Sequence, residues 1–262
     1  MTTPARAAAS ARHALERLAR SAGKFDASRY FRGAADLGFY NVGTDRLRSL
    51  ARSIYDAHRH DWSIDDAMAF ANALIVDRHL EAKSVGIEVV ARYRRDFAPR
   101  LLPTWKRWLS DNHSANWATT DAICAYLIGP LLLRYPELGA RLRVWARDRN
   151  MWVRRASIVG LIPRARRGES LDLVYEIAKR LLAGTGAGRR STTGTAGRVP
   201  SPPDLIQKAV GWALREAGKT DPARLERFLR AKGESIPRTT LRYAIERFPE
   251  STRKAILIDT RA

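Results

Sequence analysis

Apolar residues recur at helical spacing along nearly the whole chain, and this periodicity constrains the fold more than any other feature. The spacing i, i+3, i+4, i+7 occurs, for example, at Leu241, Ala244, Ile245 and Phe248. Side chains at this spacing share one face of an α-helix. The sequence has no convincing alternating pattern of the kind typical of strands, and no Asn-Gly or Asp-Gly turn between β-branched runs. It therefore predicts an all-α fold.

Prolines divide this pattern into segments of helix length. They stand at short intervals at the following positions: Pro99, Pro103, Pro130, Pro136, Pro163, Pro222, Pro237 and Pro249. The segments between them, about 12–18 residues long, suit single helices, and pairs of such helices give a unit of about 35–45 residues. We therefore expect one domain over residues 1–262, a HEAT-like helical-repeat solenoid. Its concave, positively charged face would hold a duplex.

One segment, residues 184–203, departs from the helical pattern. It reads GTGAGRRSTTGTAGRVPSPP, with five Gly, three Pro, three Arg and no acidic residue. A loop of this length is usually either functional or disordered. We expect either a mobile surface insertion or a cationic flap in which Arg189 and Arg190 contact a phosphate backbone. Helical repeats are expected to resume at Asp204.

The chain is strongly cationic, since 47 Lys and Arg against 27 Asp and Glu give a formal net charge of +20 at pH 7. Such a charge favours a polyanionic partner, nucleic acid first and an anionic membrane surface second. Arg makes up 39 of the 47 basic residues, a bias that a GC-rich genome also produces. Residues 141–167, however, hold nine Arg and a single acidic residue, Asp148. Planar guanidinium groups at this density suit phosphate oxygens.

Several classes of function lack their motifs in this sequence. The single cysteine, Cys124, excludes a disulfide framework and a Cys-based zinc or iron–sulfur site, and the five histidines lack metal-ligand spacing. Phosphate-binding loops, dinucleotide-binding glycine motifs, zinc-protease motifs and serine-hydrolase motifs are absent. We therefore expect no metal and no cofactor, and we expect Cys124 to be a small buried hydrophobic residue.

The sequence also indicates where the protein works. It has no run of 18 apolar residues, so we expect no membrane-spanning helix, and it shows no secretory signal. Residues 1–24 suit either a transit peptide or, as we favour, a first amphipathic helix. The expected protein is a cytoplasmic monomer.

Its tryptophans in apolar helical settings are expected in the core: Trp62, Trp105, Trp108, Trp145 and Trp152.

Trp117 and Asp121 form the constellation that most suggests chemistry. Four residues apart on a helix, the two side chains lie on one face, at the polar margin of an apolar run. Each also has a structural interpretation, Trp117 as a core aromatic residue and Asp121 as a cap or solvated carboxylate. Arg155 could reach Asp121, keep it ionised and also hold a phosphate. Farther along, Gly211 beside Trp212 would let a partner approach closely.

Four motifs resemble those of the AlkD-type DNA alkylation repair family. They are Trp-x-x-x-Asp at 117–121, RYPEL at 134–138, NMWVRRA at 150–156 and IQKAVGWALREAGKTDP at 206–222. The motifs follow the family's order and spacing, and the resemblance runs from about Arg29 to about Phe248. The stretch at 206–222 is specific, whereas Trp-x-x-x-Asp alone is weak. Residues 38–44 follow the family's pattern only loosely, and the 184–203 segment is longer than the family's connection.

This resemblance implies a HEAT-like-repeat DNA glycosylase that acts on double-stranded DNA. Members of the family remove cationic N-alkylated purines, such as 3-methyladenine and 7-methylguanine, by hydrolysing the N-glycosidic bond. The resemblance assigns Trp117, Asp121 and Arg155 to the catalytic cluster. It assigns Trp212 and Tyr30 to the aromatic lining of the same site.

Further basic residues are candidates for contact with the DNA backbone. They are Arg154 and Lys208, beside Arg189 and Arg190. Lys83 could also touch phosphate, although Lys83 and Lys208 are each equally well explained as a solvated helix position. Two other functions stay open: a non-catalytic HEAT-repeat scaffold that recognises damaged or bent DNA, and a HEAT adaptor for an acidic protein. A carboxylate facing phosphates gives a pure DNA binder no advantage, so Asp121 favours the enzyme.

Overall fold

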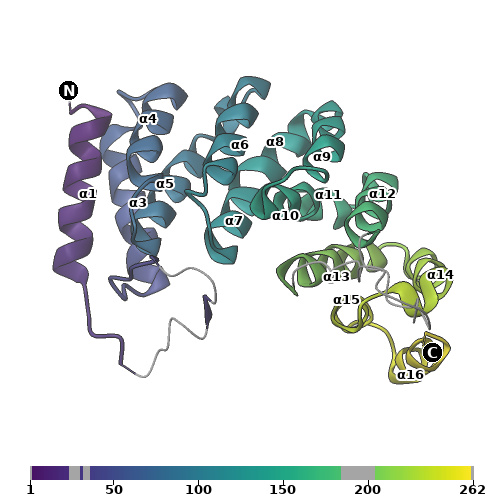
Figure 1. Cartoon of the computed structure of the whole chain (residues 1–262). Helices are drawn as coiled ribbons and strands as arrows, with labels where there is room; N and C mark the ends of the chain where they lie inside the picture. Colours follow the sequence, from purple (N-terminus) through teal and green to yellow (C-terminus); the bar gives the residue numbers. More distant parts are fainter. Residues whose placement is uncertain (1, 24–29, 32–35, 184–203, 261–262) are drawn as a thin grey trace. The chain divides into compact units, whose positions relative to one another are not determined.

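The computed structural model describes residues 2–23, 30–31, 36–183 and 204–260. Within these ranges the chain forms helices joined by turns, and the one strand-like feature is an isolated bridge between Gly38 and His79 (Figure 1). The predicted all-α helical-repeat fold is confirmed. Arg189 and Arg190, with the rest of residues 184–203, lie outside the described residues, and a helix begins at Asp204 as predicted.

The chain folds as two units, residues 1–131 and 132–262. The division falls within a short helix, α8 (Gly129–Arg134). The expectation of a single repeat domain over residues 1–262 stays a prediction.

The N-terminal unit is built around one central helix, α5. Its helices are α1 (Pro4–Leu18), α3 (Thr44–His58), α4 (Ile64–Ile75), α5 (Leu80–Arg92), α6 (Leu102–Ser110) and α7 (Trp117–Ile123). α5 packs against α1, α3, α4 and α7. A Cβ atom on Gly86 would lie 3.2 Å from the Cα atom of Ala71 in α4, so glycine allows these two helices to pack closely. The buried residues of α5 include Val85, Ile87 and Val89 and surround most of the helix, which is typical of a core helix.

The C-terminal unit packs around α13. Its helices are α9 (Gly139–Trp145), α10 (Met151–Val159), α11 (Ile162–Ala165), α12 (Leu171–Leu182), α13 (Asp204–Gly218), α14 (Pro222–Lys232), α15 (Arg238–Ala244) and α16 (Glu250–Asp259). α13 contacts α10, α12, α14 and α15. A Cβ atom on Gly211 would lie 2.5 Å from the Tyr243 Cβ and 2.7 Å from the Thr240 carbonyl oxygen. The close approach at Gly211 is therefore made by α15 of the same chain rather than by the partner expected there from the sequence.

Prolines stand at helix starts, as the breaker pattern predicts. Pro222 is the first residue of α14, Pro103 and Pro163 are the second residues of α6 and α11, and Pro237 and Pro249 directly precede α15 and α16. Proline suits the first turn because an N–H group there would lack an intrahelical acceptor. Helices such as α1, α5 and α13, with 13 to 15 residues, have the expected length of about 12–18 residues, whereas several others have only 4 to 9 residues. Packing stabilises such short helices more than intrinsic propensity does.

The core contains most of the residues expected there. Trp62, Trp105, Trp108 and Trp145 are buried, whereas Trp152, in the first turn of α10, is only half-buried. Cys124 is buried as predicted. The first helix, α1, is confirmed as amphipathic, because it buries residues at helical spacing: Ala7, Ala8, Ala11 and Leu15. None of the described helices combines the length and apolarity needed to cross a membrane.

Candidate functional site

Trp117 and Asp121 are carried by α7, whose first turn is held by side-chain hydrogen bonds. Asn116 caps the helix, and its Oδ1 accepts a hydrogen bond from the Thr119 backbone N–H at 2.8 Å. The Thr120 hydroxyl donates to the Ser114 carbonyl at 2.9 Å. Trp117 and Asp121 are both half-buried. Because four residues separate them, the two side chains lie one turn apart on the same face.

The indole of Trp117 is fixed from two directions. Its Nε1–H donates a hydrogen bond to the backbone carbonyl of Tyr30 at 3.1 Å. Its ring stacks on Phe31, with 5.4 Å between ring centroids and 10° between ring planes, and Phe31 in turn contacts Phe39 at 5.3 Å. The indole therefore belongs to an aromatic cluster and still keeps an accessible part. Tyr30 meets Trp117 through its backbone, and the residue itself is 62% exposed.

Phe39 belongs to a loop, residues 36–43, that is attached to the start of α5. The ring of Tyr40 stacks on the ring of His79, with 3.9 Å between centroids. The buried carboxylate of Glu81 accepts hydrogen bonds from the backbone N–H groups of Tyr40 at 3.1 Å and Val42 at 3.3 Å. A Cβ atom on Gly38 would lie 2.8 Å from the His79 ring, so glycine is required for this contact. These contacts fix the position of Phe39 beside Phe31, the residue on which the Trp117 indole stacks.

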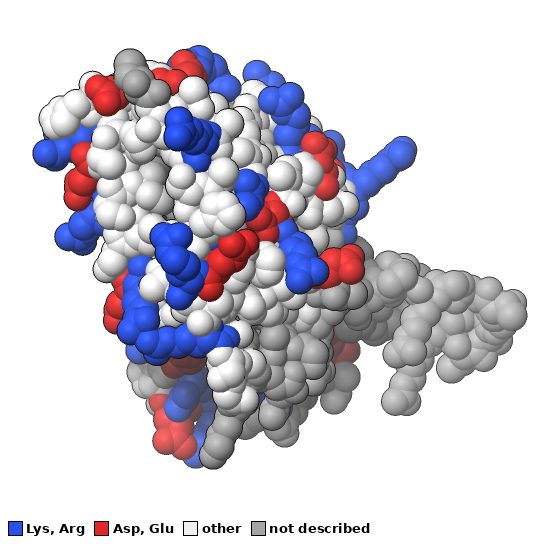
Figure 2. All heavy atoms as spheres, turned by 90° about the vertical axis from the view of Figure 1, so that its left-hand side faces the viewer, with Lys and Arg blue, Asp and Glu red and all other residues white. Residues whose placement is uncertain are grey.

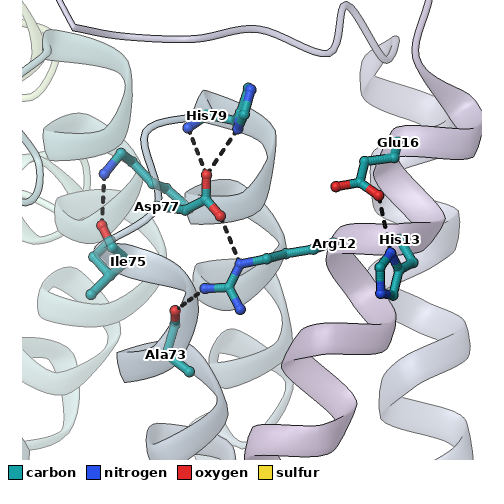
Figure 3. A network of polar contacts seen from close by, with 8 residues as sticks. Arg12, His13, Glu16, Ala73, Ile75, Asp77 and His79 are labelled. Carbon is teal, nitrogen blue, oxygen red and sulfur yellow. Dashed lines mark hydrogen bonds and ion pairs between the residues drawn. The ribbon is translucent and has the colours of Figure 1, made fainter.

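The base of this loop rests on a network of polar contacts around Asp77 (Figure 3). The Asp77 carboxylate accepts hydrogen bonds from Arg12 Nε at 2.7 Å and from the backbone N–H of His79 at 2.9 Å, and it contacts His79 Nδ1 at 2.9 Å. Arg12 also donates to the carbonyl of Ala73, near the end of α4. Burial alone would raise the pKa of the Asp77 carboxyl, but the hydrogen bonds from His79 and Arg12 outweigh it and lower this pKa below its ordinary value.

Lys83, considered from the sequence as a solvated or phosphate-binding position, is in fact buried. Its Nζ donates hydrogen bonds to the carbonyl of Ile75 at 2.7 Å and to the carbonyl of His113 at 2.8 Å. Burial lowers the pKa of the amine to about 8. The side chain thus connects the end of α4 to the loop that leads into α7. It acts on the candidate site through the backbone, and the sequence alone gives no signal for this role.

A π-helix, Cys124–Ile128, follows α7 directly and runs into α8. Pro130, the second residue of α8, has no N–H to donate to the carbonyl of Tyr126, and a π turn accommodates such a loss. Beside it lies a pocket of about 230 Å³ between α3, α5 and the π-helix, lined by polar side chains that include Arg48, Glu88 and Tyr126. Neither Trp117 nor Asp121 lines this pocket. The pocket is also smaller than ligand sites usually are, about 300–1,000 Å³.

Arg155 and Arg154 lie on α10 in the C-terminal unit. Arg155 is 5% exposed, and its Nη1 donates a hydrogen bond to the carbonyl of Leu205 in the first turn of α13. Arg154 is half-buried, and its Nη1 donates to the carbonyls of Asp148 and Arg149, both at 2.7 Å. Both guanidinium groups therefore hold backbone carbonyls in place, a structural role that the sequence did not indicate. Their predicted phosphate contacts stay predictions.

Two other predicted residues lie on α13. Trp212 is half-buried, beside the close contact of Gly211 with α15. Lys208 forms an ion pair with Asp204 one turn earlier, with 2.6 Å between Nζ and Oδ2. Such a pair on a helix surface fits the alternative of a solvated position. Trp117 and Asp121 belong to one unit and Arg155 and Trp212 to the other, so the predicted proximity of Asp121 to Arg155 stays a prediction.

The arginines of residues 141–167 divide into two groups. Five contact other groups of the protein: Arg143 with Glu176, Arg154 and Arg155 with backbone carbonyls, Arg164 with Leu132 and Glu169, and Arg166 with Glu216. The other four are exposed and have no side-chain partner among the described residues: Arg141, Arg147, Arg149 and Arg167. Arg147 and Arg149 stand in the turn between α9 and α10. Five of the nine arginines therefore stabilise the fold, and the other four are the best placed to meet an anion.

The distribution of charge over one face can be followed in Figure 2. On the side where α1 lies, Lys and Arg side chains are interspersed with Asp and Glu rather than gathered in one continuous patch. The predicted concave cationic face stays a prediction. Among the described residues, no three His, Cys, Asp or Glu side chains are grouped so that they could hold a metal ion.

Comparison with known proteins connects this arrangement to DNA repair. The family model described as "DNA alkylation repair enzyme" matches residues 11–248. No curated protein matches the chain. A solved structure, described as a "Predicted DNA alkylation repair enzyme from Enterococcus faecalis", is 17% identical and superposes with a TM-score of 0.65 over 82% of this chain and 91% of its own. That likeness shows a shared fold. The family model covers most of this chain, and the chain therefore belongs to the DNA alkylation repair enzyme family.

Proposed function

We propose that the protein is a monofunctional DNA glycosylase that excises cationic N-alkylated purines from duplex DNA by hydrolysis. The observation that carries this proposal is the pairing, on α7, of the half-buried Asp121 carboxylate with the fixed indole of Trp117. Membership of the DNA alkylation repair enzyme family supports it. We expect a monomer that works in the cytoplasm on double-stranded DNA, without metal or cofactor.

The proposed reaction needs little from the protein because the substrate is already activated. A purine alkylated at N3 or N7 carries a positive charge, so it can leave without protonation by an acid. The sugar then passes through an oxocarbenium-like state, as in glycoside hydrolysis. An ionised Asp121 can stabilise that positive charge and orient the attacking water. The residue stands one turn after Trp117 on a capped helix, so the backbone that carries the carboxylate is fixed.

Trp117 contributes a π face to the same site. The indole N–H is used by the carbonyl of Tyr30, and one ring face is covered by Phe31. The part that stays accessible can contact the cationic nucleotide, a cation–π contact worth about 0.5–2 kcal/mol. Because the stack prevents the indole from rotating, little of this energy is lost in ordering the side chain. We expect Trp212 and Tyr30 to add further aromatic contacts.

The DNA backbone would be held by cations from the C-terminal unit. We expect Arg155 to contact a phosphate next to the lesion rather than the base, since a guanidinium beside a cationic base would repel it. Arg154 and Lys208 are the other candidates within the described residues. The exposed, unpaired Arg147 and Arg149 join them, because each can reach a phosphate without breaking an existing ion pair.

The decisive experiment uses methylated duplex DNA. The purified protein is incubated with it, and released bases are identified by mass spectrometry, alongside Asp121→Asn and a control, Asp56→Asn, at an exposed position of α3. We expect 3-methyladenine or 7-methylguanine to be released by the wild type and the control, and release to fall by about 100-fold or more in Asp121→Asn, with duplex binding retained.

Other outcomes would point to other functions. Salt-sensitive duplex binding without any released base would refute the glycosylase and indicate a scaffold that recognises damaged DNA. Little affinity for the duplex would instead favour the adaptor for an acidic protein, which steeply salt-dependent duplex binding would exclude. Rapid release of a neutral base such as hypoxanthine would contradict the proposed dependence on the charge of the lesion.

A further inference from the structure

A second site is suggested by a pocket in the C-terminal unit that the proposed reaction does not use. It has a volume of about 770 Å³ and lies between α12, α14 and the turn after α14. Aromatic and cationic side chains form most of its lining: Tyr175, Phe228, Lys179, Arg224, Arg227 and Lys232. None of the candidate active-site residues belongs to these two helices. The volume suits a ligand of nucleotide size.

The charges around this pocket are unbalanced. Lys179, Arg227 and Lys232 form no ion pair with any described residue, whereas Arg224 pairs with Asp172. Asp221 is the acidic residue that lines the pocket among the described residues, and its Oδ1 is engaged by the backbone N–H of Arg224 at 2.9 Å as the cap of α14. Cations gathered without acidic partners repel one another. An anion between them would relieve this repulsion.

Tyr175 supplies an independent sign of a missing acceptor. The residue is 4% exposed, and its hydroxyl group is buried without a hydrogen-bond partner among the described residues. The ring is held by Phe228, with 5.1 Å between centroids, and by the Arg224 guanidinium, 4.5 Å above it. Buried hydroxyl groups are nearly always hydrogen-bonded, and one that is not calls for an explanation such as a missing ligand.

The hydroxyl of Tyr175 is also held in its donating form. Burial raises its pKa to about 12, although the nearby Arg224 and Arg227 act in the opposite direction. At neutral pH the group therefore keeps its proton and can donate it to an anionic oxygen. A pocket whose lining contains this donor and three unpaired cations is a suitable environment for an anion with several acceptor oxygens.

We propose that the pocket between α12 and α14 binds a phosphate group, with the Tyr175 hydroxyl donating to one oxygen and Lys179, Arg227 and Lys232 neutralising its charge. A phosphate fits better than a carboxylate because it offers more acceptor oxygens to donors that converge from two helices. The phosphate could belong to the backbone of a DNA strand or to a small soluble molecule. The inference does not depend on glycosidic cleavage, so it stands or falls separately from the proposed function.

The test compares four proteins: the wild type, Tyr175→Phe, Arg227→Gln and the control Arg247→Gln, which changes an exposed arginine of the same unit that has no ion pair among the described residues. One arm measures thermal unfolding in inorganic phosphate and in chloride at equal ionic strength. The other measures binding of an unmodified duplex by fluorescence anisotropy over a range of salt. Tyr175→Phe removes an unpaired group and should fold, and Arg227→Gln gives a second, independent variant.

For a soluble phosphate, we expect inorganic phosphate to raise the unfolding temperature of the wild type and the control, with the shift lost in both pocket variants. For a DNA phosphate, we expect the pocket variants to bind the duplex more weakly. In Arg227→Gln, the negative slope of log K against log salt should become shallower by about 0.9. The proposal is refuted if both probes act on the pocket variants as on the wild type, or if neither probe acts on the wild type.

Discussion

The buried amine of Lys83 should make the free energy of unfolding rise with pH in the alkaline range. Replacing Lys83 by Met should remove this rise. The pKa of the Lys83 amine lies at about 8 in the folded protein against a reference value of 10.5, because burial penalises the charged form. Below pH 8 the amine is protonated in both the folded and the unfolded chain. Between pH 8 and 10.5 the unfolded chain holds the proton more tightly, so the free energy of unfolding rises with pH. At 1.36 kcal/mol per pKa unit, the full rise from this group is about 3 kcal/mol.

The assay is urea unfolding of the wild type and Lys83→Met at pH values from 7 to 11, with ionic strength held constant. Other groups, such as the buried tyrosines, titrate in both proteins, so the difference between the two curves isolates Lys83. We expect the wild type to gain about 3 kcal/mol of unfolding free energy relative to Lys83→Met between pH 8 and 10.5. The control Lys254→Met, at an exposed position of α16, should follow the wild type. Parallel curves for the wild type and Lys83→Met would refute the reasoning.

Three further predictions follow from the geometry of the two units. Gly211→Ala would place a methyl group 2.5 Å from the Tyr243 Cβ, so we expect a loss of about 1–3 kcal/mol in unfolding free energy by urea titration. Changing both Arg147 and Arg149 to Gln should make duplex binding less dependent on salt: the negative slope of log K against log salt should become shallower by about 2, since each phosphate contact accounts for about 0.9. Trp117→Phe removes the indole N–H that holds the ring, and we expect base release to fall about 10-fold, with little change in duplex binding.

Each of these three predictions has a matched control. Gly43→Ala changes a glycine whose added Cβ would meet nothing within 4 Å; because Gly43 is the N-cap of α3, where Ala is less favourable than Gly, this change should cost a little stability, but less than Gly211→Ala. Arg143→Gln changes an arginine that already pairs with Glu176, so it should alter the salt slope less than either free arginine. Trp62→Phe, in the core away from α7, should affect stability rather than base release. If a control variant changes stability, salt slope or base release as much as its test variant does, the reasoning behind that prediction is wrong.

Features that depend on neighbours along the chain could be predicted from the sequence. Helical periodicity and proline positions determine the all-α fold, because both act within one or two turns. The placement of Trp117 and Asp121 on one face follows from their spacing. The resemblance in four motifs led to the DNA alkylation repair family, which the family match confirms.

Features that depend on distant segments were decided only by the tertiary structure. Trp117 is fixed by Tyr30, 87 positions away, and Arg155 is bonded to Leu205, 50 positions away. Composition counts every arginine equally, yet packing uses some as internal donors and leaves others, such as Arg147, exposed. The charge of Lys83 predicts either a solvated position or a contact with phosphate, whereas the structure buries the amine between two carbonyls. The physical reason is that periodicity reports which side of a helix is apolar, while the partner of each polar group is determined by how the helices pack.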